Sequence, residues 1–129
     1  MARPRNDGPT PAELEILRVL WERGPSTVRE VLEALAGSRK RAYTSVMSLM
    51  NVMEEKGLLS RTPQGRAFVY DAKVTRRKTR SRMLKGMLNR VFDGSANLMV
   101  AHLLEQAKPS EEELKEIRRT ITDFLNQKE

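Results

Sequence analysis

Residues 42–70 read AYTSVMSLMNVMEEKGLLSRTPQGRAFVY, and this stretch decides the fold class because its pattern changes partway along. In its first half, apolar side chains recur at i, i+3, i+4 and i+7, which predicts a helix with one buried face. We expect this helix to run from about Tyr43 to Lys56, because the glycine that follows, Gly57, is the residue type that commonly ends a helix.

A β-hairpin is predicted directly after this helix. Residues 58–62 and 67–71 are short strand-like runs, and residues 63–66 between them supply the Pro and Gly of a turn. Two earlier helices are predicted from capping boxes at residues 10–13 and 27–30. Three helices followed by a hairpin are the layout of a winged helix.

The domain organisation follows from this layout. We predict a mostly α-helical fold with a small β-hairpin wing, in which a winged helix-turn-helix is followed by an α-helical dimerisation segment. Residues 1–9 are polar and contain Pro and Gly, so they are interpreted as a flexible N-terminal arm. Residues 10–74 form the predicted DNA-binding domain, and residues 75–129 the predicted helical dimerisation domain.

The dimerisation hypothesis depends on three apolar helix seams in the C-terminal part. A lone chain offers too little partner surface to bury all three, whereas a two-fold dimer would bury them. A compact monomer, with these helices folded onto the winged domain, remains the alternative. The candidate dimerisation residues are Met83, Leu84, Met87, Leu88, Val91, Leu98, Leu103, Leu114, Ile117, Ile121 and Phe124.

Charge is distributed unevenly along the chain, whose formal net charge is +7. Residues 1–82 carry 17 Lys and Arg against 9 Asp and Glu, while residues 83–129 carry 7 against 8. A basic first part favours a polyanionic partner for that part alone. The absence of cysteine excludes disulfides and thiolate chemistry, and no apolar run is long enough for a signal peptide or a membrane span. We therefore expect a cytoplasmic protein.

The predicted third helix carries the candidate DNA-binding residues. The second helix of a helix-turn-helix enters the major groove, where short polar side chains reach base edges, and an asparagine there can pair with adenine through two hydrogen bonds. Basic residues just before this helix and on the hairpin can hold phosphates. The candidate DNA-binding residues are Arg39, Lys40, Arg41, Tyr43, Thr44, Ser45, Ser48, Asn51, Arg61 and Arg66.

These motifs resemble a known family. Residues 42–59 are similar to the recognition helix of the penicillinase-repressor family of winged-helix regulators, the BlaI/MecI type, to which copper-responsive repressors are related. The wing at 65–70 and the opening at 11–17, with Leu-Trp at 20–21, also resemble that pattern. The resemblance covers residues 10–126. It implies a homodimer that binds an inverted-repeat operator and represses transcription, often of β-lactam-resistance genes.

The resemblance also implies a mode of release, from which this chain departs. Family members are released when a membrane sensor-protease pathway leads to cleavage of the dimerisation segment. The cleavable Asn-Phe bond of staphylococcal-type members would fall near His102-Leu103, where no Asn-Phe exists. A basic residue common near the end of the recognition helix is Val52 here, and the copper-type cysteines are missing.

Other function classes were weighed against repression. An enzyme is disfavoured because no phosphate-binding loop, metal cluster or nucleophile elbow is present, and the one histidine, His102, lies in an apolar helix. No catalytic residue, metal or cofactor is expected. A winged helix that binds RNA or another protein remains the alternative, because fold alone does not decide function. Steep salt dependence of duplex binding would favour repression.

Overall fold

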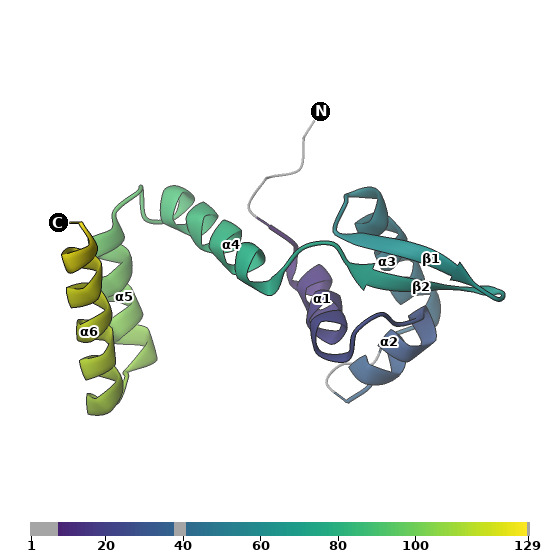
Figure 1. Cartoon of the computed structure of the whole chain (residues 1–129), viewed down its shortest axis with the longest axis horizontal. Coiled ribbons are helices and arrows are strands. Elements are labelled where there is room, and N and C mark those ends of the chain that lie inside the picture. Colours follow the sequence, from purple (N-terminus) through teal and green to yellow (C-terminus); the bar gives the residue numbers. More distant parts are fainter. Residues whose placement is uncertain (1–7, 38–40, 129) are drawn as a thin grey trace. The chain divides into compact units, whose positions relative to one another are not determined.

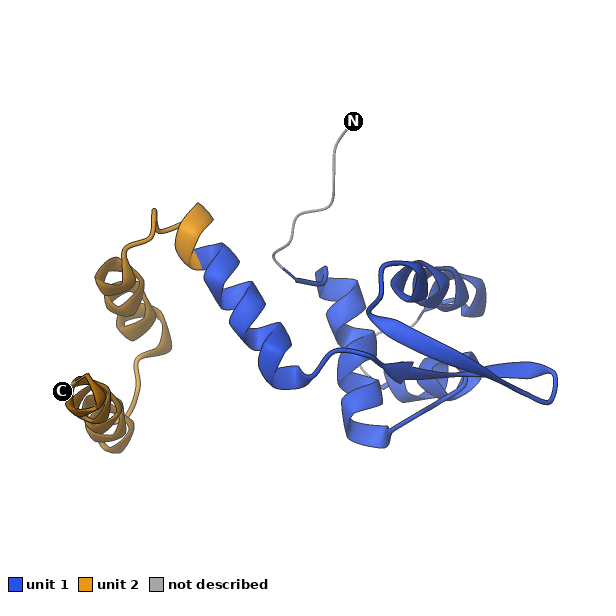
Figure 2. Cartoon of the chain, turned by 45° about the horizontal axis from the view of Figure 1, so that its top comes forward, with its two compact units in different colours: residues 1–87 blue, residues 88–129 orange. Residues whose placement is uncertain are grey.

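The computed structural model describes residues 8–37 and 41–128. Its elements are α1 (Pro11–Arg23), α2 (Val28–Leu35), α3 (Tyr43–Glu55), β1 (Leu59–Gln64), β2 (Ala67–Ala72), α4 (Arg76–Arg90), α5 (Ala96–Ala107) and α6 (Glu111–Gln127) (Figure 1). The predicted fold class is confirmed, since three helices, a hairpin and further helices follow in that order. The chain divides into two compact units at residue 87, shown in different colours in Figure 2.

The core of the first unit lies where α1, α2 and α3 meet beneath the hairpin. Full burial of an aliphatic side chain contributes about 1.5–3 kcal/mol, so this cluster is what holds the three helices together. The predicted buried face of α3 is confirmed, with Leu49 half-buried at its edge. The buried apolar residues are Ile16, Leu17, Leu20, Val28, Val31, Leu35, Val46, Met50, Met53, Leu58, Leu59 and Tyr70.

Helix ends follow the predicted signals. The hydroxyls of Thr10 and Thr27 each accept a hydrogen bond from the backbone N–H three residues on, and the glutamate at that position bonds back. Both capping boxes are therefore formed. Gly57 has a φ of +86°, a left-handed conformation in which a side chain would be strained, and it turns the chain from α3 into β1.

The wing is longer than predicted. We expected residues 63–66 to form the turn, but Pro63 pairs with Phe68 and Gln64 with Ala67 in the antiparallel ladder. The loop is therefore only Gly65-Arg66. Gly65 has a φ of +62°, as the first position of a tight two-residue hairpin turn requires. The strand accommodates Pro63 because a two-stranded sheet consists of edge strands, in which a missing N–H is tolerated.

A pair of backbone hydrogen bonds joins the wing to the segment between α1 and α2. Ser26, between α1 and α2, exchanges two backbone hydrogen bonds with Tyr70 of β2, at 2.9 and 2.8 Å. Both residues are buried. This bridge fixes the base of the wing against the helical core, and nothing in the local sequence pattern of Ser26 predicted it.

The start of α4 belongs to the first unit. Thr75 caps it as predicted, since its hydroxyl accepts a hydrogen bond from the Lys78 N–H at 3.1 Å. Thr79 is buried, and its hydroxyl donates to the Thr75 carbonyl at 2.8 Å. Pro9 is buried as well, so the last residue of the predicted N-terminal arm is part of the folded unit. Residues 1–7 of that arm lie outside the described residues.

The second unit contains the α5–α6 helical hairpin. Ser95 caps α5 by accepting a hydrogen bond from the Leu98 N–H, and Ser110 caps α6 by accepting one from the Glu113 N–H, both at 3.1 Å. Val91, one of the candidate dimerisation residues, follows the last residue of α4 and does not lie in a helix. Neither α5 nor α6 has a buried residue. A helix that could cross a bilayer is not found in the described ranges.

Candidate nucleic-acid interface

The exposed face of α3 is a row of short polar side chains. Thr44, Ser48 and Asn51 recur at i, i+4 and i+7, which places them on the side of the helix opposite its buried residues. Ser45 is also exposed, at the edge of this row. One turn beyond Asn51 the same face carries the exposed carboxylate of Glu55, which would repel phosphates. The face suited to a polyanion is therefore the N-terminal part of the helix.

Asn51 is only partly free. Its side-chain oxygen Oδ1 accepts a hydrogen bond from the hydroxyl of Tyr70 at 2.9 Å and another from the guanidinium of Arg61 at 3.3 Å. Because both partners are donors, the amide is oriented with Oδ1 toward the wing and its Nδ2 donors remain for a ligand. Tyr70 was not among the predicted site residues, although it holds one of them.

The two predicted arginines of the hairpin differ in their surroundings. Arg61 stacks over the ring of Phe68, with 4.3 Å from the guanidinium carbon to the ring centroid, in addition to its bond to Asn51. Arg66 is exposed at the tip of the wing, and within the described chain it has no ion-pair partner. Arg66 is therefore the cation of the wing that remains available to a phosphate or a minor groove.

Of the three basic residues predicted just before α3, the structure describes Arg41. Arg41 forms an ion pair with Glu15 of α1 at 2.9 Å, and its side chain is only 19% exposed. Its charge is thus largely used within the fold. Arg39 and Lys40 lie outside the described residues.

A groove of about 380 Å³ separates α2 and α3 from the wing. Four predicted residues line it, namely Tyr43, Asn51, Arg61 and Arg66. Its other lining residues were not predicted, and they include Arg29, Met47 and Phe68. Arg29 lies over the ring of the partly exposed Tyr43, at 5.2 Å from its centroid. Its position on the exposed side of the second amphipathic helix was the signal that could have identified it.

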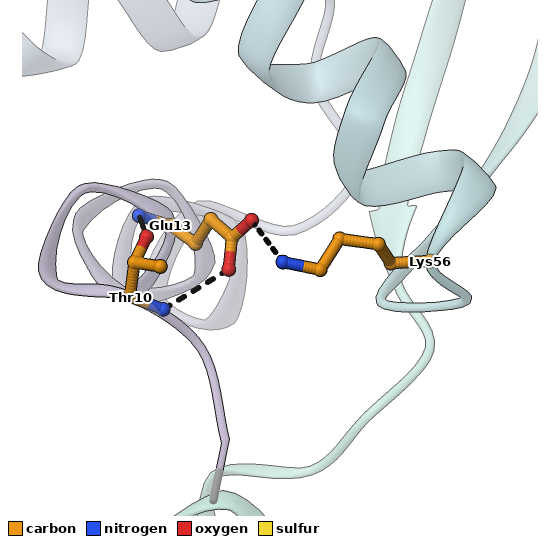
Figure 3. Close-up of polar contacts among 3 residues, drawn as sticks. All are labelled: Thr10, Glu13 and Lys56. Carbon is orange, nitrogen blue, oxygen red and sulfur yellow. Dashed lines mark hydrogen bonds and ion pairs between the residues drawn. The ribbon is translucent and has the colours of Figure 1, made fainter. Parts of the chain in front are cut away.

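The far end of α3 is attached to α1 by a buried carboxylate (Figure 3). The Glu13 carboxylate accepts a hydrogen bond from the Thr10 backbone N–H at 3.0 Å, and it forms an ion pair with Lys56 Nζ at 2.7 Å. The Glu13 side chain is 3% exposed. The glutamate of the first capping box thus also links the start of α1 to Lys56, the residue that follows α3.

Comparisons with known proteins agree with this architecture. The family model described as "Penicillinase repressor" matches residues 9–123. A penicillinase repressor from Bacillus licheniformis is 27% identical over 117 residues, covering 91% of each chain. The methicillin resistance regulatory protein MecI of Mammaliicoccus sciuri is 23% identical and is covered to 92%.

A solved structure supports the fold of the first unit. The DNA-binding domain of the repressor BlaI, solved in solution, superposes with a TM-score of 0.50 at 23% identity. The match covers 57% of this chain and 90% of that domain. Because the family model spans nearly all of the sequence, from the end of the arm into α6, the chain belongs to the penicillinase repressor family.

Proposed function

We propose that this chain represses transcription as a homodimer that binds an inverted-repeat operator, with the α3 of each subunit in one major-groove half-site. The observation that carries the proposal is the row of exposed Thr44 and Ser48 with half-buried Asn51, bordered on the wing side by Arg61 and Arg66. Membership in a family of transcriptional repressors, and not of enzymes, agrees with it. Such a repressor acts where bacterial DNA lies, in the cytoplasm.

The side chains of the row have separate roles in this proposal. Thr44, Ser45 and Ser48 reach base edges, since a hydroxyl both donates and accepts. Asn51 offers only donors, because Oδ1 is bonded to Tyr70 and Arg61. The two-bond pairing with adenine expected from the sequence would need that oxygen, so we assign to Asn51 a base acceptor such as a purine N7 or thymine O4.

We assign the phosphate contacts to the wing and to the first residues of α2 and α3. Arg66 reaches the backbone or minor groove beside the half-site, and Arg29 with Tyr43 borders the other side of the groove. The apolar side chains of Met47 and Phe68 in the same groove offer a surface for thymine methyl groups. Arg41 contributes mainly to the fold, because its charge is paired with Glu15.

The homodimer is supported by apolar surface that the single chain leaves uncovered. The exposed members of the predicted set include Phe124, at 61% exposure, and Met83, Leu88 and Ile117 are partly covered. Full burial of an exposed apolar side chain contributes about 1.5–3 kcal/mol, and roughly half of each of these is still uncovered, so a second copy must cover several of them together to gain a substantial driving force. The exposed members, at 42% to 63% exposure, are Leu84, Met87, Val91, Leu98, Leu103, Leu114, Ile121 and Phe124.

The names of the relatives suggest which genes are regulated. Penicillinase and methicillin-resistance regulators are among them, so we propose β-lactam-resistance-type genes as targets. A membrane sensor-protease pathway would then be the route of induction. Cleavage at the staphylococcal-type position would meet His102-Leu103 in this chain, so that step requires a different bond.

Selection from a random duplex pool tests the proposal. We expect the full chain to enrich an inverted repeat, to sediment as a dimer at micromolar concentration, and to lose duplex affinity steeply as salt rises. Equal binding to scrambled duplex, single strands and RNA would overturn sequence-specific repression. Enrichment of a single half-site by a monomer would overturn the dimer alone.

A further inference from the structure

The first three turns of α4 carry an unusual concentration of positive charge. From Arg76 to Arg90 this helix has seven Lys and Arg and no Asp or Glu, so its cations alone equal the net charge of the whole chain, +7. None of them belongs to the α3–wing interface. Arg76 is engaged within the fold, since it pairs with Glu22 at 3.7 Å and lies over the ring of Trp21.

Three of these cations lie on one exposed face of the helix. Lys78, Arg82 and Lys85 recur at i, i+4 and i+7, and all three are exposed. They are not among the ion pairs of the described residues. We call these three residues the α4 stripe.

The charge pattern of α4 works against the stability of the helix. Cations occupy its first turn, where the positive end of the helix dipole disfavours them, and Lys78–Arg82 and Arg82–Lys85 are like-charge neighbours. A purely structural helix has no reason for this arrangement. A surface that meets a polyanion does, because the partner neutralises the repulsion.

The stripe is separate from the apolar seam of the same helix. Leu84 and Met87, both exposed, project from a different side of α4, so covering them in a dimer leaves the stripe accessible. At its N-terminal end the stripe borders a hollow of about 220 Å³, where Lys78 and Arg82 meet Pro9 and Leu58.

We propose that the α4 stripe binds the sugar-phosphate backbone of duplex DNA, outside the contacts made by α3 and the wing. This inference rests on the proposed function. Lys78 and Lys85 are about 10 Å apart along the helix axis at ~1.5 Å per residue, and one strand of the duplex carries a phosphate every ~3.4 Å of its axis, so the stripe is long enough to reach several phosphates. A membrane surface fits less well, because insertion would need the apolar side of α4, where Leu84 and Met87 lie, and the proposed dimer covers that side.

The test compares two triple variants of the full chain with equal loss of charge. In the first, Lys78, Arg82 and Lys85 are each replaced by Gln. In the control, Lys108, Lys115 and Arg119 of the second unit are replaced by Gln. Binding to a fluorescent mixed-sequence duplex several helical turns long is measured by anisotropy across a salt series.

We expect the stripe variant to flatten the plot of log affinity against log salt by about two to three units, since each phosphate contact contributes ~0.9. The control should change it by less than one. Equal slopes for the two variants would overturn the proposal, whereas failure of the unsubstituted chain to bind duplex would instead remove the proposed function. A stripe variant that binds phosphatidylglycerol vesicles more weakly than the parent chain does, but binds DNA equally well, would also overturn the proposal, in favour of a lipid surface.

A melting curve shows that the result does not reflect misfolding. Removing like charges from an exposed helix should leave the melting temperature unchanged or raise it. A clearly lower melting temperature would show that the three cations are needed for the fold, which contradicts the proposal.

Discussion

For the ion pair between Glu13 and Lys56, we predict that replacing the more exposed partner, Lys56, lowers the free energy of unfolding more than replacing Glu13. Removing one partner of a fully buried pair costs about 3–5 kcal/mol, because the other charge is left without compensation. Lys56 is 37% exposed and Glu13 only 3%. Water therefore reaches part of the site, and we expect Lys56→Met to lower the free energy of unfolding by about 2 kcal/mol.

Neutralising the buried partner should cost less. In Glu13→Gln the amide oxygen can still accept the Thr10 N–H bond, and the freed Lys56 ammonium turns to solvent, so we expect a loss of about 1 kcal/mol. The double variant should then resemble Glu13→Gln alone, because no buried charge remains.

Urea denaturation followed by circular dichroism measures all three variants against the parent chain. Thr120→Ala on α6 serves as a control, since its hydroxyl makes only an exposed intrahelical bond. If Lys56→Met is as stable as the parent, or if the two losses simply add in the double variant, the carboxylate is not held by Lys56 and our reasoning is refuted.

Three further predictions concern DNA binding and assembly. Tyr70→Phe removes the hydroxyl that orients Asn51, so duplex selection should show weakened preference at one base pair per half-site while overall affinity for random duplex is unchanged; an unchanged motif would contradict it. Arg66→Ala should weaken all duplexes alike and lower the salt slope by about one in an anisotropy titration, and a loss restricted to one sequence would show base reading instead. Ile121→Asp should shift sedimentation from dimer to monomer, and a dimer of undiminished stability would place the interface elsewhere.

The sequence predicted what local patterns determine. Capping boxes at Thr10 and Thr27 located two helices, and the change of period after Gly57 located the wing. These signals act over a few residues, so a single sequence contains them. The turn of the wing is still shorter than predicted, because Pro63 is tolerated on an edge strand and the loop needs only Gly65-Arg66.

Local sequence patterns could not predict contacts between residues that lie far apart in the sequence. Nothing near Ser26 indicates its bridge to Tyr70, 44 positions later, and nothing near Lys56 indicates its pairing with Glu13. The same limit affected the candidate site. Asn51 was identified by its place on the helix, but the occupancy of its Oδ1 depends on Tyr70 and on Arg61 of the wing.

The most direct test of the central claim is the affinity of Ser48→Ala for the selected operator and for each of its single base-pair variants. We predict that this substitution relaxes preference at one base pair in each half-site by ~1–3 kcal/mol and leaves the other positions unchanged. Thr120→Ala, a small change on α6 outside every proposed DNA contact, should alter none. Identical preferences for the parent chain and Ser48→Ala at every position would contradict base reading by this side chain of α3.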